Sequence, residues 1–129
     1  MLLSVKNLAT HFHAGPGKIA RAVDGISFEL EQGKTLAIVG ESGCGKSQTA
    51  FSIMRLIAEN GYHPTGEIQL EGKRLFKLGR EEMRNLRGND IAMIFQEPMT
   101  SLNPLFRIGD QLEEPLKQHL KIAKGDTRK

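Results

Sequence analysis

The feature that most constrains the fold of this chain is the glycine-rich segment at residues 40–47, Gly-Glu-Ser-Gly-Cys-Gly-Lys-Ser, which fits G-x-x-x-x-G-K-[ST]. The preceding run, residues 35–39, is continuously apolar, as is typical of a strand buried on both faces. Apolar residues then recur with the spacing of an amphipathic helix, at Ala50, Ile53, Met54 and Ile57. Gly61 after Asn60 is a typical helix stop. Strand, loop and helix in this order are the context that a phosphate-binding loop (P-loop) requires.

The residue types in this loop suit phosphate chemistry. Glycines let successive backbone N–H groups converge on phosphate oxygens, and a helix that starts near Lys46 adds the positive end of its dipole. Lys46 can reach the β- and γ-phosphates, and the Ser47 hydroxyl can bind Mg²⁺. A chance glycine-rich turn is the alternative, and the flanking strand and helix argue against it. Lys46, Ser47 and the backbone of Gly43 and Gly45 are expected to hold the phosphates. The expected cofactor-binding residues in and beside the loop are Gly40, Glu41, Ser42, Gly43, Cys44, Gly45, Lys46, Ser47 and Gln48.

The rest of the chain predicts an α/β fold. Further strands are expected at residues 2–8, 26–30, 66–71 and 91–95, with a turn at residues 15–17. We expect a short polar helix over residues 80–87 and a loop over residues 97–104. Leucine and isoleucine four residues apart predict a last helix from Ile108 to Leu120, which Pro115 would start or kink. The polar tail, residues 124–129, is expected to be frayed.

Composition limits the function classes. The 18 basic residues interleave with 15 acidic ones, and a formal charge of +3 predicts no nucleic-acid partner. The single cysteine excludes an internal disulfide and suits a reducing compartment. No apolar run approaches the roughly 20 residues that span a bilayer, so we expect a cytoplasmic protein with at most a peripheral membrane role. The four histidines lack metal-ligand spacing and are expected to be solvated: His11, His13, His63 and His119.

Three stretches carry a resemblance to a known family. They are residues 21–28 (Arg-Ala-Val-Asp-Gly-Ile-Ser-Phe), residues 40–50, and residues 94–104 (Ile-Phe-Gln-Glu-Pro-Met-Thr-Ser-Leu-Asn-Pro). Over essentially its whole length the chain resembles the ATP-binding subunit of ABC transporters, in the peptide and nickel importer branch, and the third stretch is the most specific to that branch. The resemblance implies that residues 1–129 form the N-terminal part of one nucleotide-binding domain. That domain combines a P-loop NTPase core with an antiparallel β-subdomain, and its helical subdomain would start at about residues 98–121.

The resemblance also assigns two residues outside the P-loop. Gln96 matches the family's Q-loop glutamine, whose carbonyl touches Mg²⁺ and the attacking water, so Gln96 would be catalytic and would share the metal with Ser47. Phe12 matches the aromatic residue that stacks on adenine, although a core role at the strand end stays open. Glu97 is not expected to be the catalytic base, because Gln96 stands where the Mg²⁺-binding Asp of that motif is required.

The resemblance implies an ATPase subunit that uses ATP and Mg²⁺ to drive import of peptides or similar solutes. Its partners would be transmembrane permease subunits and a second ATP-binding subunit, which would hold it on the inner face of the cell membrane. The 129 residues contain no Leu-Ser-Gly-Gly signature and no apolar strand that ends in Asp-Glu. We therefore expect a domain truncated before its signature and second carboxylate motif, and inactive in hydrolysis by itself. Two alternatives remain: a remnant that binds no nucleotide, and another P-loop enzyme such as a small-molecule kinase, against which residues 96–104 argue.

Overall fold

The computed structural model describes residues 1–120, which divide into two compact units, Met1–Leu78 and residues from Gly79 onward. The first unit contains strands β1 (Leu3–His13), β2 (Ile19–Leu30), β3 (Gly61–Tyr62), β4 (Glu67–Leu70) and β5 (Lys73–Arg74), helix α1 (Lys46–Met54) and the 3₁₀ turn η1 (Leu75–Lys77). The second unit contains α2 (Arg80–Leu86), the 3₁₀ turn η2 (Pro98–Thr100) and α3 (Ile108–Leu120). Residue 121, at the end of the expected helical subdomain, and the tail at residues 124–129 lie outside the described residues.

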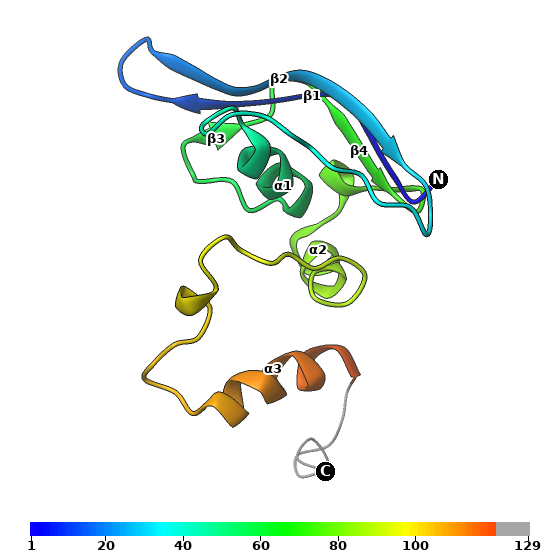
Figure 1. Ribbon diagram of the computed structural model, residues 1–129, viewed down its shortest axis with the longest axis vertical. Helices are drawn as coiled ribbons and strands as arrows, with labels where there is room; N and C mark the ends of the chain where they lie inside the picture. The colour runs from blue at the N-terminus through cyan, green and yellow to red at the C-terminus, as the bar shows by residue number, and fades with distance from the viewer. Residues whose placement is uncertain (121–129) are drawn as a thin grey trace. The chain divides into compact units, whose positions relative to one another are not determined.

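A five-stranded antiparallel sheet forms the frame of the first unit, with the order β2-β1-β4-β5 and with β3 also paired to β1 (Figure 1). The predicted turn at residues 15–17 joins β1 and β2 into a hairpin that pairs from Leu3↔Leu30 to His13↔Ile19. This pairing carries β1 five residues beyond the predicted end at residue 8, because β2 hydrogen-bonds along the whole of its length. The expected strand at residues 26–30 is confirmed as part of β2, and β4 occupies the middle of the strand expected at residues 66–71.

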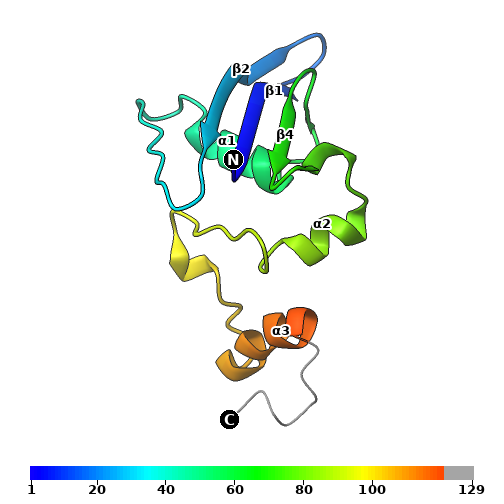
Figure 2. The same ribbon diagram turned by 90° about the vertical axis from the view of Figure 1, so that its right-hand side faces the viewer.

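Helix α1 lies across one face of this sheet (Figure 2). In the first unit, the fully buried apolar side chains come from the sheet and from the segments packed around it: Val5, Leu8, Ile68 and Leu75. Helix α1 itself buries only Thr49, Ser52 and Met54, so two of its three buried side chains are polar. The helix ends at Met54 because Arg55 takes a left-handed conformation at φ 52°, which leaves Ile57 outside the helix that was predicted to include it.

Hydrogen bonds between side chains join α1 to β1. The Ser52 Oγ donates to the Gln48 carbonyl at 2.6 Å and lies 2.7 Å from the Thr10 Oγ1. The Thr10 Oγ1 lies in turn 3.1 Å from the His63 Nδ1, which is 3.3 Å from the Ala9 carbonyl. Thr10 and Ser52 are completely buried. A buried hydroxyl without a partner is costly, so this chain satisfies polar groups that the apolar core could not.

Three of the four histidines expected to be solvated are half-buried: His11, His63 and His119. The His63 ring stacks on Phe76 with centroids 4.5 Å apart, and burial lowers the pKa of His63 below its usual value. The positive charge of Arg55 lowers this pKa further, against a raising effect of the Ala9 carbonyl. The side chain of His11 is only 12% exposed and lies 3.6 Å from the Asp24 carboxylate. Ring burial depends on neighbours far away in the sequence, such as Phe76 beside His63 and Asp24 beside His11, and this explains the error.

Two predicted strands are absent. Residues 35–39 have no regular structure, and Leu36, Ile38 and Val39 are 43%, 45% and 88% exposed. Residues 91–95 form no strand beyond one isolated bridge from Arg87 to Ile91, and Ile94 is 93% exposed. A strand buried on both faces needs a hydrogen-bonded neighbour and a covering layer. Within residues 1–120 the antiparallel strands pair with one another. They give residues 35–39 and 91–95 neither a neighbouring strand nor a covering layer.

The second unit confirms the predicted helices. Helix α2 begins at Arg80, where the Glu82 carboxylate accepts the Gly79 N–H at 2.7 Å. Helix α3 contains Pro115 in its interior rather than at its start. The Gln111 side chain fixes the segment before α3: its amide donates to the carbonyls of Asn103 and Phe106 at 2.9 and 3.0 Å. Within residues 1–120, no helix is both long enough and apolar enough to cross a bilayer.

The lowered pKa of His63 predicts a pH dependence of stability. The unfolded chain takes up a proton at His63 near pH 6.5, whereas the folded chain does so only at lower pH. The unfolded state therefore binds more protons between these values, and the free energy of unfolding falls as the pH drops below about 7 until it reaches the lowered pKa. Urea unfolding at pH 7.5 and 5.5 should show a smaller difference in the His63→Gln variant than in the unmodified chain. His13→Gln, a change at an exposed histidine, is the control. Equal pH dependence in His63→Gln and the unmodified chain would contradict this account.

Candidate functional site

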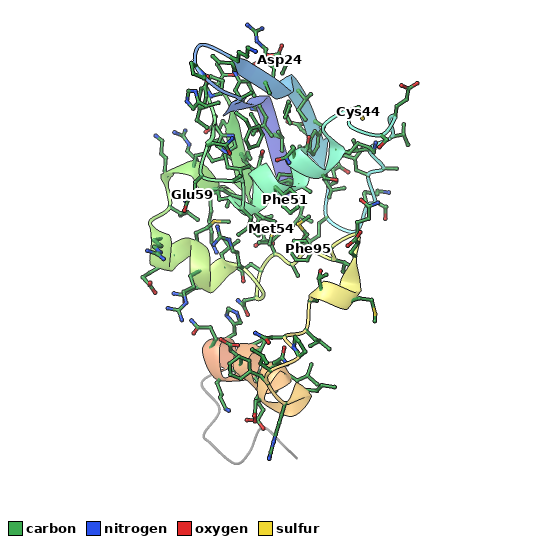
Figure 3. The ribbon with its side chains drawn as sticks, turned by 90° about the vertical axis from the view of Figure 1, so that its left-hand side faces the viewer. Asp24, Cys44, Phe51, Met54, Glu59 and Phe95 are labelled. Atoms are coloured by element: carbon green, nitrogen blue, oxygen red, sulfur yellow. The ribbon has the colours of Figure 1, made fainter. Side chains whose placement is uncertain are left out.

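The P-loop lies in the first unit, and α1 follows it directly, as predicted. Gly43 and Gly45 have φ angles of 79° and 89°, a left-handed conformation that residues with side chains rarely adopt. Between them Cys44 closes a turn, in which its N–H donates to the Glu41 carbonyl at 3.3 Å. The loop runs beside β2, and Cys44 is exposed on it (Figure 3). The loop and the helix of the predicted motif are thus present, while the strand before them is not.

The start of α1 is packed directly against β2. A Cβ atom at Gly45 would lie 2.1 Å from the Ala22 carbonyl oxygen, so only glycine fits there. The Gly45 carbonyl accepts both the N–H and the hydroxyl of Thr49, at 2.9 and 3.0 Å. No side chain caps this helix end. The N–H groups of its first turn therefore have no capping side chain and point toward the loop, which is the arrangement that favours an anion.

The ammonium group of Lys46 is folded into the loop. Its Nζ donates to the Gly40 and Glu41 carbonyls at 2.7 and 2.6 Å, and it lies 3.4 Å from the Cys44 Sγ. The loop thus surrounds a positive charge with backbone acceptors. A phosphate group is anionic, so its bond with the ammonium group joins two opposite charges, whereas the present bonds join one charge to neutral carbonyls. The lysine is placed where it can exchange these carbonyls for such an acceptor.

The other predicted loop residues differ in exposure. Glu41, Ser42 and Ser47 are exposed, and Ser47 stands in the first turn of α1. Gln48 is half-buried, and its Oε1 atom has no hydrogen-bond partner among the described residues. Within residues 1–120, no group of three or more His, Cys, Asp or Glu side chains could hold a metal ion. The predicted Mg²⁺ ligand in the loop is the hydroxyl of Ser47, and its binding of Mg²⁺ stays a prediction.

Phe12 lies on β1, opposite Ala20 of β2 and Gly61 of β3. Its ring is half-buried and packs closely over Gly61, where a Cβ atom would lie 2.7 Å from the ring carbon Cε1. One part of the ring thus packs in the core and another part is accessible. This arrangement is compatible with adenine stacking and with a core role, so both remain predictions.

Gln96 belongs to the second unit, where it is exposed. With Phe95, Glu97, Thr100 and Ser101 it lines a shallow pocket. The Thr100 hydroxyl donates to the Glu97 carbonyl at 3.0 Å and closes the turn beyond Gln96. The contacts of Gln96 with Mg²⁺ and water stay predictions.

The sequence reasoning missed the residues that hold the P-loop helix in place. Thr10, Ser52 and His63 form the buried chain between α1 and β1, and the Ala22 carbonyl faces Gly45. One signal was available: Thr10 follows Leu8 and Ala9 in an apolar stretch, as a buried hydroxyl would. Thr10 and Ser52 are 42 residues apart, so no local sequence pattern could predict that they pair.

The two loop glycines provide a matched test of this geometry. Both are left-handed, but a Cβ at Gly43 would meet nothing within 4 Å, whereas one at Gly45 would overlap the Ala22 carbonyl. We expect Gly43→Ala to lower the free energy of unfolding by about 1–2 kcal/mol, the usual cost of a left-handed residue. Gly45→Ala should cost roughly 2–5 kcal/mol, because overpacking adds to that cost. Equal losses for the two variants in urea unfolding would show that α1 does not approach β2 in this way.

Comparison with known proteins places the chain among transporter ATP-binding proteins. A family model described as ABC transporter matches residues 23–128. The dipeptide transport ATP-binding protein DppD of Lactococcus lactis subsp. cremoris is 50% identical over 129 residues, which are 99% of this chain and 37% of DppD. The oligopeptide transport ATP-binding protein OppD of Bacillus subtilis is 51% identical over 129 residues, or 99% of this chain and 36% of OppD. The chain thus spans little more than a third of the length of these relatives.

Two solved structures of the ATP-binding cassette MJ0796 resemble the fold. A dimeric post-hydrolysis state with ADP and Pi matches with a TM-score of 0.78, over 98% of this chain and 52% of that chain. A second dimeric structure matches with a TM-score of 0.81 and the same coverage. Sequence identity is 23% in both cases, so this likeness concerns the fold alone. It confirms the α/β fold class expected from the sequence.

Proposed function

The chain belongs to the ABC transporter family, and on that premise we propose that it carries the phosphate-binding part of an ATP-binding subunit that drives import of peptides or similar solutes. The observation that carries the proposal is the P-loop, in which Lys46 points inward at the start of an uncapped helix. DppD and OppD, at 50% and 51% identity, are named as dipeptide and oligopeptide transport ATP-binding proteins, which supports the solute class. Since the chain covers about a third of each, the activity of a whole subunit is part of the proposal.

The loop residues have separate roles in nucleotide binding. Backbone N–H groups near Gly43 and Gly45 surround the phosphates, because left-handed glycines turn successive N–H groups to the same side. Lys46 leaves the carbonyls of Gly40 and Glu41 and bonds the β- and γ-phosphates. The Ser47 hydroxyl would be a ligand of Mg²⁺, and the family resemblance gives Gln96 a role toward Mg²⁺ and the attacking water. Bound Mg-ATP supplies the charge that these groups neutralise.

The proposed partners follow from the family. Transmembrane permease subunits would hold the protein at the inner face of the cell membrane, and a second ATP-binding subunit would complete the nucleotide sites. The structures of MJ0796 are dimeric, which supports the second partner for this fold. The mixed charges, 18 basic and 15 acidic residues, support a function without nucleic acid.

The 129-residue chain should bind Mg-ATP and release no phosphate above background. Binding needs the P-loop, whereas transfer to water also needs a Mg²⁺ carboxylate, and the sequence contains no apolar strand that ends in Asp-Glu. Calorimetric titration should show Lys46→Ala to bind at least about tenfold more weakly, since charged hydrogen bonds contribute roughly 1.5–3 kcal/mol. Lys18→Ala, at the exposed hairpin turn, should bind as the unmodified chain does.

Two results would contradict this proposal. A folded chain that binds no Mg-ATP would favour a remnant without nucleotide binding. Steady phosphate release that disappears in Lys46→Ala would show that the chain needs no further carboxylate.

Phe12 provides a test of the adenine site. Stacking of a base on an aromatic ring contributes about 1–3 kcal/mol in single-strand binders, so Phe12→Ala should weaken Mg-ATP binding by a factor of about 5 to 150. Phe12→Tyr keeps the ring face and should keep the affinity. A core role would instead lower the unfolding free energy of Phe12→Ala without nucleotide. Unchanged stability and unchanged affinity in Phe12→Ala would exclude both roles.

A further inference from the structure

The contact between α1 and the sheet depends on polar groups to an unusual degree. Of the three side chains that α1 buries, only Met54 is apolar, while Thr49 and Ser52 carry hydroxyls. The half-buried Ala50, Phe51 and Ile53 add apolar contacts, but apolar contacts are not directional and leave a short helix free to slide or rotate on a sheet. Hydrogen bonds fix both distance and direction. The Thr49 hydroxyl donates to the Gly45 carbonyl at the start of the helix, whereas Ser52 lies within hydrogen-bond distance of Thr10 on β1 and so fixes the direction of α1 on the sheet.

The hydrogen bonds that reach across to β1 can run in one direction only. A carbonyl oxygen only accepts, so the Ser52 hydroxyl donates its single proton to the Gln48 carbonyl, 2.6 Å away. Thr10 must then donate to Ser52 over 2.7 Å, and the His63 Nδ1–H must donate to Thr10 over 3.1 Å. The same Nδ1–H also faces the Ala9 carbonyl at 3.3 Å. Thr10 and Ser52 thus depend on each other, because the removal of either hydroxyl takes a buried hydrogen-bond partner from the other.

The chain lies close enough to the P-loop to control its geometry. Ser52 follows Lys46 by six residues along a nine-residue helix, which corresponds to about 9 Å at roughly 1.5 Å per residue. Gly45 fixes the first end of α1 against the Ala22 carbonyl. At the other end, the Arg55 guanidinium donates to the carbonyls of Leu75 and Leu78 at 3.0 and 2.7 Å. Between these two ends, the Thr10–Ser52 hydrogen bond joins the helix to β1.

From this geometry we infer that the buried chain Thr10–Ser52–His63 positions the P-loop: it sets the placement of α1 on β1, and so of Lys46 and Ser47 toward the nucleotide phosphates. The inference rests on the proposed function and extends it to residues outside the loop. None of the three touches the nucleotide. They act through the helix, so their loss changes affinity by displacing groups that remain chemically intact.

Two substitutions at Thr10 separate hydrogen bonding from packing. Thr10→Val keeps the shape of the side chain and loses the hydroxyl, whereas Thr10→Ser keeps the hydroxyl and loses a methyl group. Calorimetric titration of the 129-residue chain with Mg-ATP, at a temperature where all variants are folded, should show about threefold to tenfold weaker binding by Thr10→Val. Thr10→Ser should bind within about twofold of the unmodified chain. A packing role predicts the reverse order, because serine leaves a cavity and valine does not.

Ser4 offers a matched control on the same strand. It is also buried on β1, but its hydroxyl has no hydrogen-bond partner among the described residues. Ser4→Ala should leave the affinity unchanged, whereas Ser52→Ala should weaken binding as Thr10→Val does. The effects of Thr10→Val and Ser52→Ala should not add in the double variant, because both break the same contact. Should Thr10→Val fail to fold, Ser52→Ala against Ser4→Ala carries the same comparison.

The outcomes distinguish this inference from the proposed function. If the unmodified chain binds Mg-ATP and both Thr10→Val and Ser52→Ala bind equally well, the inference is overturned and the proposed function stands. If Thr10→Ser weakens binding more than Thr10→Val, packing rather than hydrogen bonding positions the helix, and the inference is again overturned. If the folded unmodified chain binds no Mg-ATP, the proposed function itself fails.

Discussion

The contact of helix α1 with the antiparallel sheet is the constraint on which the rest of the first unit depends. The P-loop has little regular structure of its own, so its shape is determined by the helix that follows it. That helix is held by the close approach of Gly45 to the Ala22 carbonyl and by the buried Thr10–Ser52 bond. Both contacts join residues far apart in the sequence. The antiparallel sheet therefore supplies the support for a loop whose chemistry is encoded in eight adjacent residues.

The two sides of the P-loop differ in what supports them. On the C-terminal side, α1 packs on β1 and β2 within the same unit. On the N-terminal side, the apolar residues 35–39 remain irregular, and Val39 is 88% exposed. An exposed apolar segment of this kind is unfavourable in water, and a hydrogen-bonded neighbour with a covering layer would stabilise it as a strand. The loop is thus held by α1 on its C-terminal side. On its N-terminal side, residues 35–39 lack the strand structure that their sequence favours.

Features that depend on near neighbours were predictable from the sequence. The P-loop and the turn at residues 15–17 were found from their glycines, α3 from apolar periodicity and α2 as a short polar helix. The α/β class and the family, recognised by resemblance, are confirmed. The strand predicted at residues 35–39 was wrong, because apolar composition records a preference for burial and does not supply a partner. The solvated His63 was wrong for the opposite reason: β1 and Phe76 bury it from positions that no local pattern connects.

The central claim is that the P-loop, held by α1 on the antiparallel sheet, binds the phosphates of a nucleotide. The most direct measurement is a residue-resolved amide NMR titration of the ¹⁵N-labelled chain with Mg-ATP, repeated with adenosine. The account predicts that Mg-ATP shifts the amide signals of Gly43, Gly45 and Lys46 most strongly, that adenosine leaves them unchanged, and that the hairpin-turn amide of Gly17 responds to neither. Saturable binding of Mg-ATP with no shift at Gly43, Gly45 and Lys46 would contradict the claim.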